Sequence, residues 1–348
     1  MLIEFSFHQI DPRCTLEQVF PFPFPKTNRS LCSEITESDP EKREELLLWQ
    51  NTLDHVSEGK LSWEQFLQKL GKPISSHPAA RIATTRSGQT LLHLAVLLDR
   101  RDVIQELSRE VALKTRRNSF GLTPLEIAQY LDRKESILLL QSPGDRLFCN
   151  RSRVSIPDSA KELFSRLEYL SHPIFEKEEL MHELLKKTNK AKLDDEIPPE
   201  KIWMGVYFDK EIQKGIHPLV SIQYIDDEVG YGVYAKQRIP SCAFVGEYTG
   251  IVQERKKKHL KDKYYCVRYT VWEMGRRNFV IDAEEKGNFT RFINHSSKPN
   301  LGLQSVYWRG LPRMIFVALK EIQEGTQLTF DYGAFFWKEC PQTPKLFE

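Results

Sequence analysis

The sequence predicts an α+β protein in which a helical N-terminal half precedes a mostly β C-terminal region. A 33-residue repeat with helical periodicity lies in the first half, and from Lys201 the pattern changes to short β-type runs separated by Gly and Pro. Of 348 residues, 40% are hydrophobic and 28% charged, enough apolar material for two modest cores. The expected segments are an N-terminal extended segment with capping helices (1–85), repeats (86–142), a helical linker or cap (143–200), and a β domain with an aromatic tail (201–348, core 222–333).

Composition excludes several broad classes. Fifty Lys and Arg against 48 Asp and Glu leave a net charge of +2, so no chain-wide field favours nucleic acid or membranes. We expect no membrane span and no Sec-type signal peptide, because no uncharged apolar run approaches about 18 residues and the first residues lack a basic region. Six widely spaced cysteines favour a reducing compartment and no zinc site.

The N-terminal segment is expected to provide caps for the repeats. Residues 20–39 alternate Phe and Pro and then become Ser- and Glu-rich, which indicates either a recognition tag or a strap buried against the first helices. Residues 41–53 and 61–70 have helical apolar spacing, with Ser62 as the N-cap of the second helix.

The repeat is carried by Gly88, Thr90, Leu92 and Ala95, each matched by the same residue 33 positions later. The period and the pattern G-x-T-P-L-H-x-A resemble ankyrin repeats, whose usual role is to bind proteins. In such a unit Gly makes the turn, Thr caps the first helix, and Ala allows close helix packing. His93 belongs to this pattern, so a hydrogen-bonded structural histidine is favoured over a metal or catalytic one.

Two copies are fewer than a solenoid needs, so helices at 159–170 and 176–187 are expected to cap the array. The charged segment 190–200 joins it to the β region. Strands are predicted at 202–208, 219–225, 232–236, 244–252, 264–271, 278–282, 301–306, 314–318 and 327–330.

Four clusters in the β region place Gly, Asn, His and Tyr where a plain sheet would carry branched residues. They read G-Y-G-V-Y-A (230–235), G-E-Y-T-G (246–250), R-F-I-N-H-S-S-K-P-N (291–300) and L-T-F-D-Y-G (328–333). In order and spacing they resemble the SET domain of protein-lysine methyltransferases, over residues 222–333. The glycine pair alone is a weak signal, whereas the ten-residue string is a specific one.

The resemblance implies S-adenosylmethionine as methyl donor, with no metal. It implies that Gly230, Tyr231 and Gly232 bring the backbone close to the donor. Asn294 is similar to the residue that binds its methionine end, and His295 to the segment that holds its adenine. Arg291 resembles the start of a segment that threads beneath the closing strand in a pseudoknot and contributes to the donor site.

Tyr332 resembles the family's catalytic tyrosine, which orients the incoming amine; a phenol of pKa near 10 is a poor base at neutral pH. The resemblance places Tyr265 on the wall of the lysine channel, with Tyr264 as the alternative, since neighbours on a strand face opposite sides. Tyr248 and Phe330 are expected to line the same channel. Phe330 stands at the position where members of the resembled family carry Phe or Tyr. The resemblance implies that a Tyr hydroxyl there holds a space-filling water, so Phe330 suggests di- or trimethylation.

The sequence departs from the family at its zinc ligands. Ser297 stands where many members have Cys, and the tail after residue 333 contains a single cysteine, Cys340. Phe335, Phe336 and Trp337 follow the last motif, and they either close over the donor or anchor the C-terminus. Trp337 is therefore a candidate donor-binding residue.

Together these patterns predict a lysine N-methyltransferase acting on histones or nucleosomes, with the repeats binding substrate or another protein. The basic run from Arg255 to Lys263 is either a solvated face or a weak DNA contact. Repeats ahead of a zinc-free SET-like domain resemble effectors that intracellular bacteria direct at host chromatin. The expected location is intracellular, at chromatin, reached by a non-Sec route if secreted. Alternatives are a non-catalytic scaffold and a nucleic-acid-binding protein.

Overall fold

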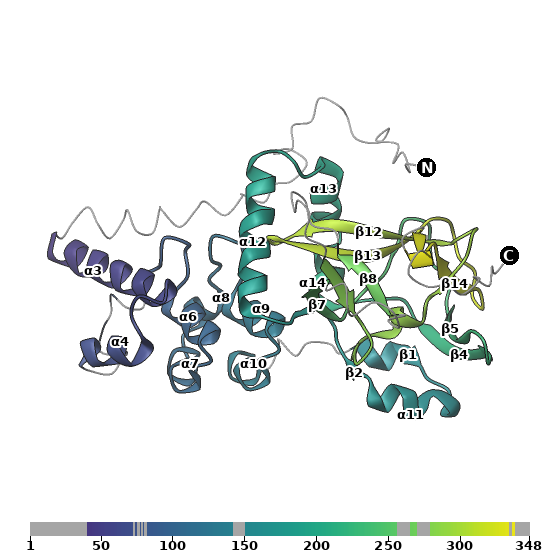
Figure 1. The fold of residues 1–348 in the computed structure, drawn as a ribbon, viewed down its shortest axis with the longest axis horizontal. Helices are drawn as coiled ribbons and strands as arrows, with labels where there is room; N and C mark the ends of the chain where they lie inside the picture. Colours follow the sequence, from purple (N-terminus) through teal and green to yellow (C-terminus); the bar gives the residue numbers. More distant parts are fainter. Residues whose placement is uncertain are drawn as a thin grey trace. The chain divides into compact units, whose positions relative to one another are not determined.

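The computed structural model describes residues 40–71, 74, 77, 79, 82–141, 150–255, 265–269, 279–333 and 336–337. The chain divides into two compact units, Met1–Leu91 and Leu92–Glu348 (Figure 1). The finer boundaries at residues 85, 142 and 200 remain predictions. Within the described part of the chain, no helix is both long and apolar enough to cross a membrane.

The first unit contains helices α3 (Pro40–Ser57) and α4 (Trp63–Leu70). Both were predicted, and the N-cap at Ser62 is confirmed. The Ser62 hydroxyl accepts a hydrogen bond from the Gln65 amide, and the Gln65 side chain accepts one from the Ser62 amide, which closes a capping box. The predicted strap at 20–39 lies outside the described residues.

Two helical hairpins follow at the predicted period. The first is α6 (Leu91–Leu97) with α7 (Arg101–Leu107); the second, after the short α8 (Val111–Thr115), is α9 (Pro124–Tyr130) with α10 (Lys134–Leu140). Every bound of the second hairpin lies 33 residues after its counterpart. The Thr85 amide bonds to the Gln89 carbonyl, and 33 residues later the Asn118 amide bonds to the Leu122 carbonyl, both at 2.9 Å. The ankyrin assignment itself remains a prediction.

His93 has the structural role that was favoured for it. Its ring lies fully buried, and Nε2 donates to the Leu122 carbonyl at 3.0 Å. Burial lowers the pKa of His93 to about 4, against the smaller opposing effect of that hydrogen bond. The ring is therefore neutral, and its hydrogen bond joins helix α6 of the first hairpin to the turn before α9 of the second.

After α10 come helices α11 (Asp158–Arg166), α12 (Glu178–Leu193), α13 (Pro199–Tyr207) and α14 (Asp209–Lys214). The strand predicted at 202–208 was wrong, because these residues form α13. A proline in the first turn starts the helix, Met204 and Phe208 are buried one turn apart, and Val206 and Tyr207 are 52% and 62% exposed. The apolar run thus has helical rather than alternating burial. Figure 1 shows α12 and α13 beside the β12–β13 hairpin.

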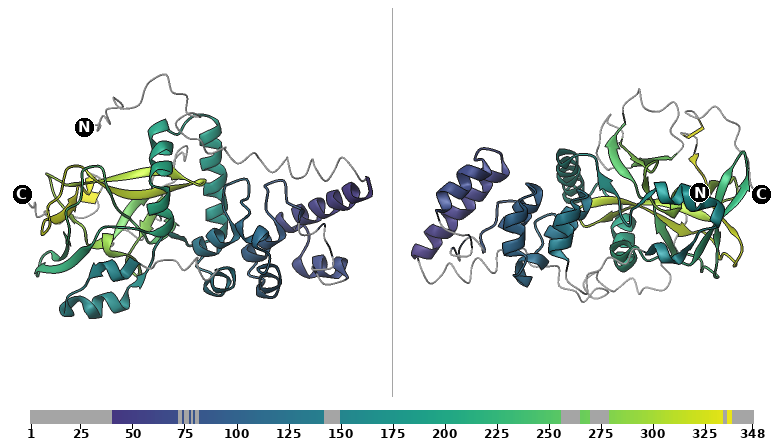
Figure 2. Two further views of the ribbon diagram at one scale, coloured as in Figure 1. Left: turned by 180° about the vertical axis from the view of Figure 1, so that it is seen from behind. Right: turned by 90° about the horizontal axis from the view of Figure 1, so that it is seen from below.

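The main sheet has the strand order β1-β4-β5-β14-β12-β13-β6, with β11 paired to β14. A second sheet has the order β3-β7-β9-β8, and β10 pairs with β2. Figure 2 shows the strands of the C-terminal region, coloured green to yellow, from two further sides. The strands are β1 (Val154–Ser155), β2 (Glu168–Tyr169), β3 (Ile174–Phe175), β4 (Val220–Asp226), β5 (Gly230–Ala235), β6 (Phe244–Glu247), β7 (Ile251–Glu254), β8 (Cys266–Tyr269), β9 (Phe279–Asp282), β10 (Lys286–Gly287), β11 (Asn294–His295), β12 (Leu301–Trp308), β13 (Leu311–Ala318) and β14 (Gln327–Phe330).

The strand predictions other than 202–208 are confirmed within a few residues, although the single strand predicted at 244–252 is two strands, β6 and β7. The pairing that matters most for a site is parallel: Asn294 lies opposite Thr329 and His295 opposite Phe330. It brings the ten-residue string beside the closing strand. The threading that would make this a pseudoknot remains a prediction.

Candidate active site

The backbone of β5 and the side chain of Asn294 meet at the end of β11. Asn294 Nδ2 donates to the Tyr231 carbonyl at 3.0 Å. Gly232 leaves no room for a side chain, because a Cβ there would lie 2.7 Å from both Gln327 Nε2 and Ile225 Cδ1 and 3.2 Å from Asn294 Nδ2. The first and third motifs therefore form one cradle with a glycine at its tightest point.

Two further features of this cradle suit a polar ligand. Gly230, at the start of β5, has a φ of +76° and open space where a Cβ would lie. Gln327 Nε2 is buried and has no hydrogen-bond partner among the described residues. Buried donors normally find a partner, so the amide is available to a bound group at this point.

Tyr332 is fixed against the same string by both its ends. Its amide donates to His295 Nδ1 at 3.2 Å, and its hydroxyl donates to the Ile293 carbonyl at 3.1 Å. The phenol is thereby oriented by the Ile293 carbonyl, and the Tyr332 backbone is held by the His295 ring. The two motifs that the sequence identified as most specific are in direct contact.

His295 is buried, and burial lowers its pKa, against the opposing attraction of the Asp331 carboxylate 3.6 Å away. The imidazole is neutral at neutral pH and behaves as an aromatic surface. It lies edge-on to Trp337, with ring centroids 4.9 Å apart, and 5.4 Å from Tyr332.

The aromatic residues after the last motif pack on this site. Phe336 contacts Tyr332 edge-to-face at 4.6 Å between centroids, and Trp337 lies nearly parallel to the Tyr332 ring at 5.9 Å. Two roles were considered for these residues, closing over the donor and anchoring the C-terminus. Their packing on Tyr332 favours the first. Their role in donor binding remains a prediction.

A second aromatic group lies behind Tyr332. Phe330 contacts both Tyr332 (4.8 Å) and Phe316 (4.9 Å), and Tyr248 lies 6.4 Å from Phe316. Burial raises the pKa of Tyr248 well above its usual range, and nearby Cys266 and Tyr332 raise it further. The Tyr248 hydroxyl is therefore neutral, and it donates to the Tyr265 carbonyl at 2.8 Å.

Tyr265 begins the β8 segment, and the Arg291 guanidinium lies over its ring at 3.6 Å. Arg291 Nη1 also donates to the Glu284 carbonyl at 2.9 Å. Arg291 was predicted to contribute to the donor site. These contacts place its side chain on Tyr265, the predicted channel residue, and do not include Asn294. Tyr264, the alternative channel residue, lies outside the described residues.

Sequence reasoning missed Phe316, Gln327 and the carbonyl of Ile293. Phe316 lies in a fully buried strand, where its aromatic contact with Phe330 has no local signal. Gln327 opens β14 just before the L-T-F-D-Y-G motif, and its position opposite β5 could have been found by extending that motif one residue towards the N-terminus.

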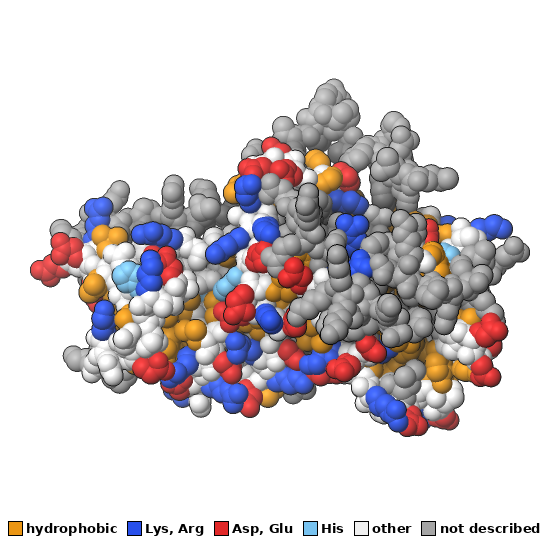
Figure 3. All heavy atoms as spheres, viewed as in Figure 1, with side chains coloured by type: hydrophobic (Ala, Val, Ile, Leu, Met, Phe, Trp, Pro, Cys, Tyr) orange, Lys and Arg blue, Asp and Glu red, His pale blue; other side chains and the backbone are white. Residues whose placement is uncertain are grey.

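Other predicted sites are only partly covered. In the described part of the chain no three His, Cys, Asp or Glu side chains gather as a metal site, and Cys340 lies outside that part. Of the basic run, residues 256–263 also lie outside it. On the face in Figure 3, Lys and Arg are interspersed with Asp and Glu across the described residues.

Comparison with known proteins agrees with this geometry. Residues 230–333 match the SET domain family. The histone-lysine N-methyltransferase SUV39H1 of Xenopus laevis is 32% identical over 130 residues, which cover 35% of this chain and 31% of that protein. The histone-lysine N-methyltransferase SETD2 of Homo sapiens is 34% identical over 126 residues (35% of this chain, 5% of that protein). The histone-lysine N-methyltransferase EHMT1 of Mus musculus is 33% identical over 131 residues (36% and 10%).

The matches thus span about a third or less of the length of these relatives. They fall on the β-rich region that carries the cradle and Tyr332. Residues 230–333 are therefore a SET domain, and the proteins it is similar to are histone-lysine N-methyltransferases.

Proposed function

We propose that the protein is an S-adenosylmethionine-dependent protein-lysine N-methyltransferase that acts on histones. The observation that carries this proposal is the contact between the Asn294–His295 strand and Tyr332, which puts a glycine-lined cradle and an oriented phenol side by side. Relatives named as histone-lysine N-methyltransferases support the substrate class.

The cradle suits the methyl donor. Gly230 and Gly232 would let the ligand approach the β5 backbone, Asn294 and the Gln327 amide would meet its polar methionine end, and the neutral His295 would provide a flat surface for the adenine. Tyr231 contributes its carbonyl, which already holds Asn294. Trp337 would cover the ligand from the C-terminal side. When bound, the donor supplies an electrophilic methyl group.

The remaining chemistry falls to the aromatic residues. A lysine amine has a pKa near ~10.4 and must lose a proton before it can attack. Apolar walls from Tyr248, Phe330 and Phe316 disfavour the charged ammonium, exclude water and hold the amine in line. The Tyr332 hydroxyl, which donates to the Ile293 carbonyl, is held in a fixed position from which it orients the amine. Tyr265 is assigned to the channel wall.

The proposal includes di- or trimethylation, because Phe330 contributes no hydroxyl to the channel. Phe330→Tyr is expected to shift the products of full-length protein towards monomethyl-lysine, measured by mass spectrometry at high enzyme concentration. Monomethyl product alone from the wild type, with an unchanged pattern in the variant, would contradict this part.

The helical hairpins are proposed to bind the substrate or a second protein, and Arg255 with the basic residues after it to make a weak DNA contact. We further propose that the protein acts at chromatin inside a cell. If it is secreted, it would reach that cell by a non-Sec route, as bacterial effectors do. This part of the proposal is supported by the pairing of helical repeats with a SET domain.

The proposal is tested by incubating the full chain with methyl-labelled S-adenosylmethionine and either core histones or nucleosomes. We expect label on lysine, a loss of about 100-fold or more for Tyr332→Phe, and unchanged binding of S-adenosylhomocysteine to that variant. Donor binding without label transfer to any histone would instead favour a non-catalytic scaffold. No donor binding at all would contradict both.

A further inference from the structure

A charged side chain lies at the centre of the second unit. Arg313, in β13, has a side chain that is 1% exposed, and its partner Glu247, at the end of β6, is 4% exposed. Arg313 Nε and Nη2 both donate to the Glu247 carboxylate, Nη2 to Oε2 at 2.5 Å. The third donor group, Nη1, donates to the Tyr130 hydroxyl at 2.7 Å.

The position of the Arg313 side chain is fixed by its hydrogen bonds and its charge partner. Burial opposes the charge on Arg313, but Glu247, Tyr130 and Tyr269 together outweigh that effect and raise the pKa of Arg313. A buried ion pair of this kind persists only when its groups are well aligned and hydrogen-bonded. The Arg313 guanidinium also lies 4.7 Å from the Trp308 ring. A small displacement of Glu247 or Tyr130 would therefore destabilise the buried Arg313 charge strongly.

Glu247 connects the centre to the candidate channel. Its carbonyl accepts hydrogen bonds from Asn288 Nδ2 at 2.9 Å and Thr290 Oγ1 at 3.3 Å, in the segment that leads to Arg291. The next residue, Tyr248, donates its amide hydrogen to the Met314 carbonyl at 2.8 Å and its hydroxyl hydrogen to the Tyr265 carbonyl. Glu247 and its neighbour Tyr248 are thus bonded to the segment that leads to Arg291 and to Tyr265, which is predicted to line the channel.

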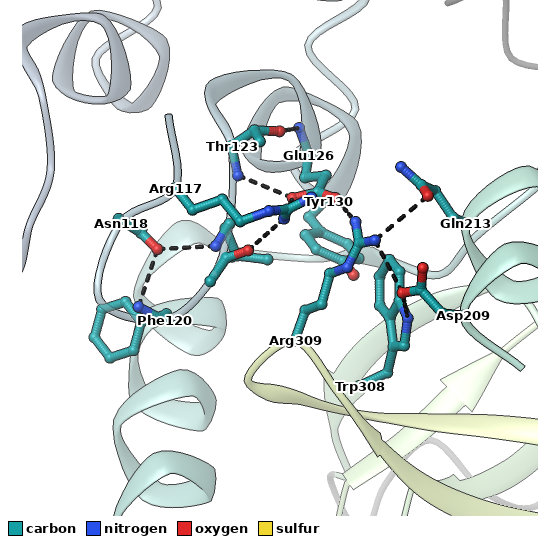
Figure 4. A network of polar contacts seen from close by, with 12 residues as sticks. Arg117, Asn118, Phe120, Thr123, Glu126, Tyr130, Asp209, Gln213, Trp308 and Arg309 are labelled. Atoms are coloured by element: carbon teal, nitrogen blue, oxygen red, sulfur yellow. Dashed lines mark hydrogen bonds and ion pairs between the residues drawn. The ribbon is translucent and has the colours of Figure 1, made fainter. Parts of the chain in front are cut away.

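Tyr130 brings the helical hairpins into the same arrangement. It is the last residue of α9, and its ring is packed edge-to-face on Phe175 at 5.8 Å. One turn earlier on α9, Glu126 bonds to Arg309 at the tip of the β12–β13 hairpin, and Arg309 also bonds to Asp209 at 2.9 Å (Figure 4). Helix α9 therefore contacts the hairpin at two places, and the Tyr130 contact alone reaches Arg313.

We propose that Arg313 is a positioning residue for methyl transfer, and that the Tyr130 hydroxyl of the repeat helix completes its setting. This rests on the proposed function, since it assigns the way in which Tyr248 and Tyr265 are held in the lysine channel. The second helical hairpin is then a structural component of the active site as well as a binding surface.

The test uses full-length Tyr130→Phe, which removes one buried hydroxyl and keeps the ring. The matched control is Arg309→Gln, which breaks the bonds to Glu126 on the same helix and to Asp209 on α14. Arg309 shares the Trp308 ring with Arg313, but among the described residues no hydrogen bond joins the two. Four quantities are measured: amide hydrogen exchange over residues 246–250 and 265–269, kcat and KM for histone methylation, and affinity for S-adenosylhomocysteine.

Tyr130→Phe is expected to speed exchange in both segments and to lower kcat by about tenfold, because small misplacements of reacting groups are costly. Affinity for S-adenosylhomocysteine stays within about twofold of the wild type, and Arg309→Gln changes none of these quantities at 25 °C. Equal exchange and equal kcat in the two variants would overturn the inference.

The outcomes separate this inference from the proposed function. If the wild type methylates no histone, the proposed function fails, and amide hydrogen exchange alone then tests the further inference. Faster exchange in Tyr130→Phe than in Arg309→Gln supports the positioning role of Arg313. Equal exchange in the two variants overturns it. A drop in melting temperature shared by both variants, with unequal exchange and kcat, supports the inference because loss of stability alone would affect both alike.

Discussion

The helical hairpins and the candidate active site are held together by bonds of different reach. In the hairpins, the turn bonds join residues four apart, Thr85 to Gln89 and Asn118 to Leu122, and the cap at Thr123 reaches three residues. The bond that links one hairpin to the next, from His93 to Leu122, spans 29 residues. In the site, Asn294 reaches Tyr231, 63 residues earlier, and Tyr332 reaches Ile293, 39 residues earlier. The turn bonds recur because the sequence around them repeats every 33 residues. The site, by contrast, forms only when strands distant in the sequence pair in the sheet.

The buried pair between Arg313 and Glu247, 66 residues apart, is another long-range link. Glu247→Ala leaves a buried guanidinium without its counter-ion, and we expect it to lower the free energy of unfolding by about 3–5 kcal/mol. Glu321→Ala, which breaks the exposed pair with Arg238, should have a far smaller effect on the free energy of unfolding, because solvent screens that pair. Urea denaturation of both variants measures the difference, and similar losses would contradict the ranking.

Acid is expected to weaken the helical hairpins through His93. Because its pKa is about 4 when folded and about 6.5 when unfolded, the unfolded chain binds the extra proton. The contribution of His93 is complete above pH 6.5 and is lost as the pH falls towards 4, about 2 kcal/mol between pH 7 and 5. His93→Gln, which keeps a donor for the Leu122 carbonyl, should flatten the pH dependence of unfolding by that amount. An unchanged slope would show that His93 is not buried neutral.

The cradle is tested by Gly232→Ala, since the added Cβ would displace Gln327 and Ile225. We expect S-adenosylhomocysteine to bind about tenfold more weakly, which is about 1.4 kcal/mol. Gly325→Ala is the control at a glycine of positive φ with open space around it and outside the cradle. Calorimetric titration distinguishes them, and equal affinities would remove Gly232 from the donor site.

The smallest expected effect belongs to the local bonds. Thr123→Ala removes the hydroxyl that caps α9, and we expect it to cost about 1 kcal/mol of stability with donor affinity unchanged. Thermal unfolding and the same titration check this. A loss of donor affinity would mean that the cap of α9 influences the cradle, contrary to the distinction drawn between the two regions.

The same distinction explains how much the sequence could predict. The 33-residue period, the cap at Ser62 and most strands depend on local patterns, and the structure confirms them. The proximity of Asn294 and Tyr332 was reached through a family resemblance, because nothing local to either residue indicates it. The strand predicted at 202–208 was wrong because its apolar residues suit either element, and packing against β12 decides for a helix. Arg313 was not singled out, since a charged residue within an apolar strand becomes interpretable only with its partners in place.

A crystal structure of the full chain with S-adenosylhomocysteine tests the central claim most directly. The account predicts the ligand against Gly230–Gly232 and the Asn294–His295 strand, with its sulfur facing the Tyr332 hydroxyl. Ligand bound anywhere else, or a complex in which Tyr332 points away from the sulfur, would contradict it.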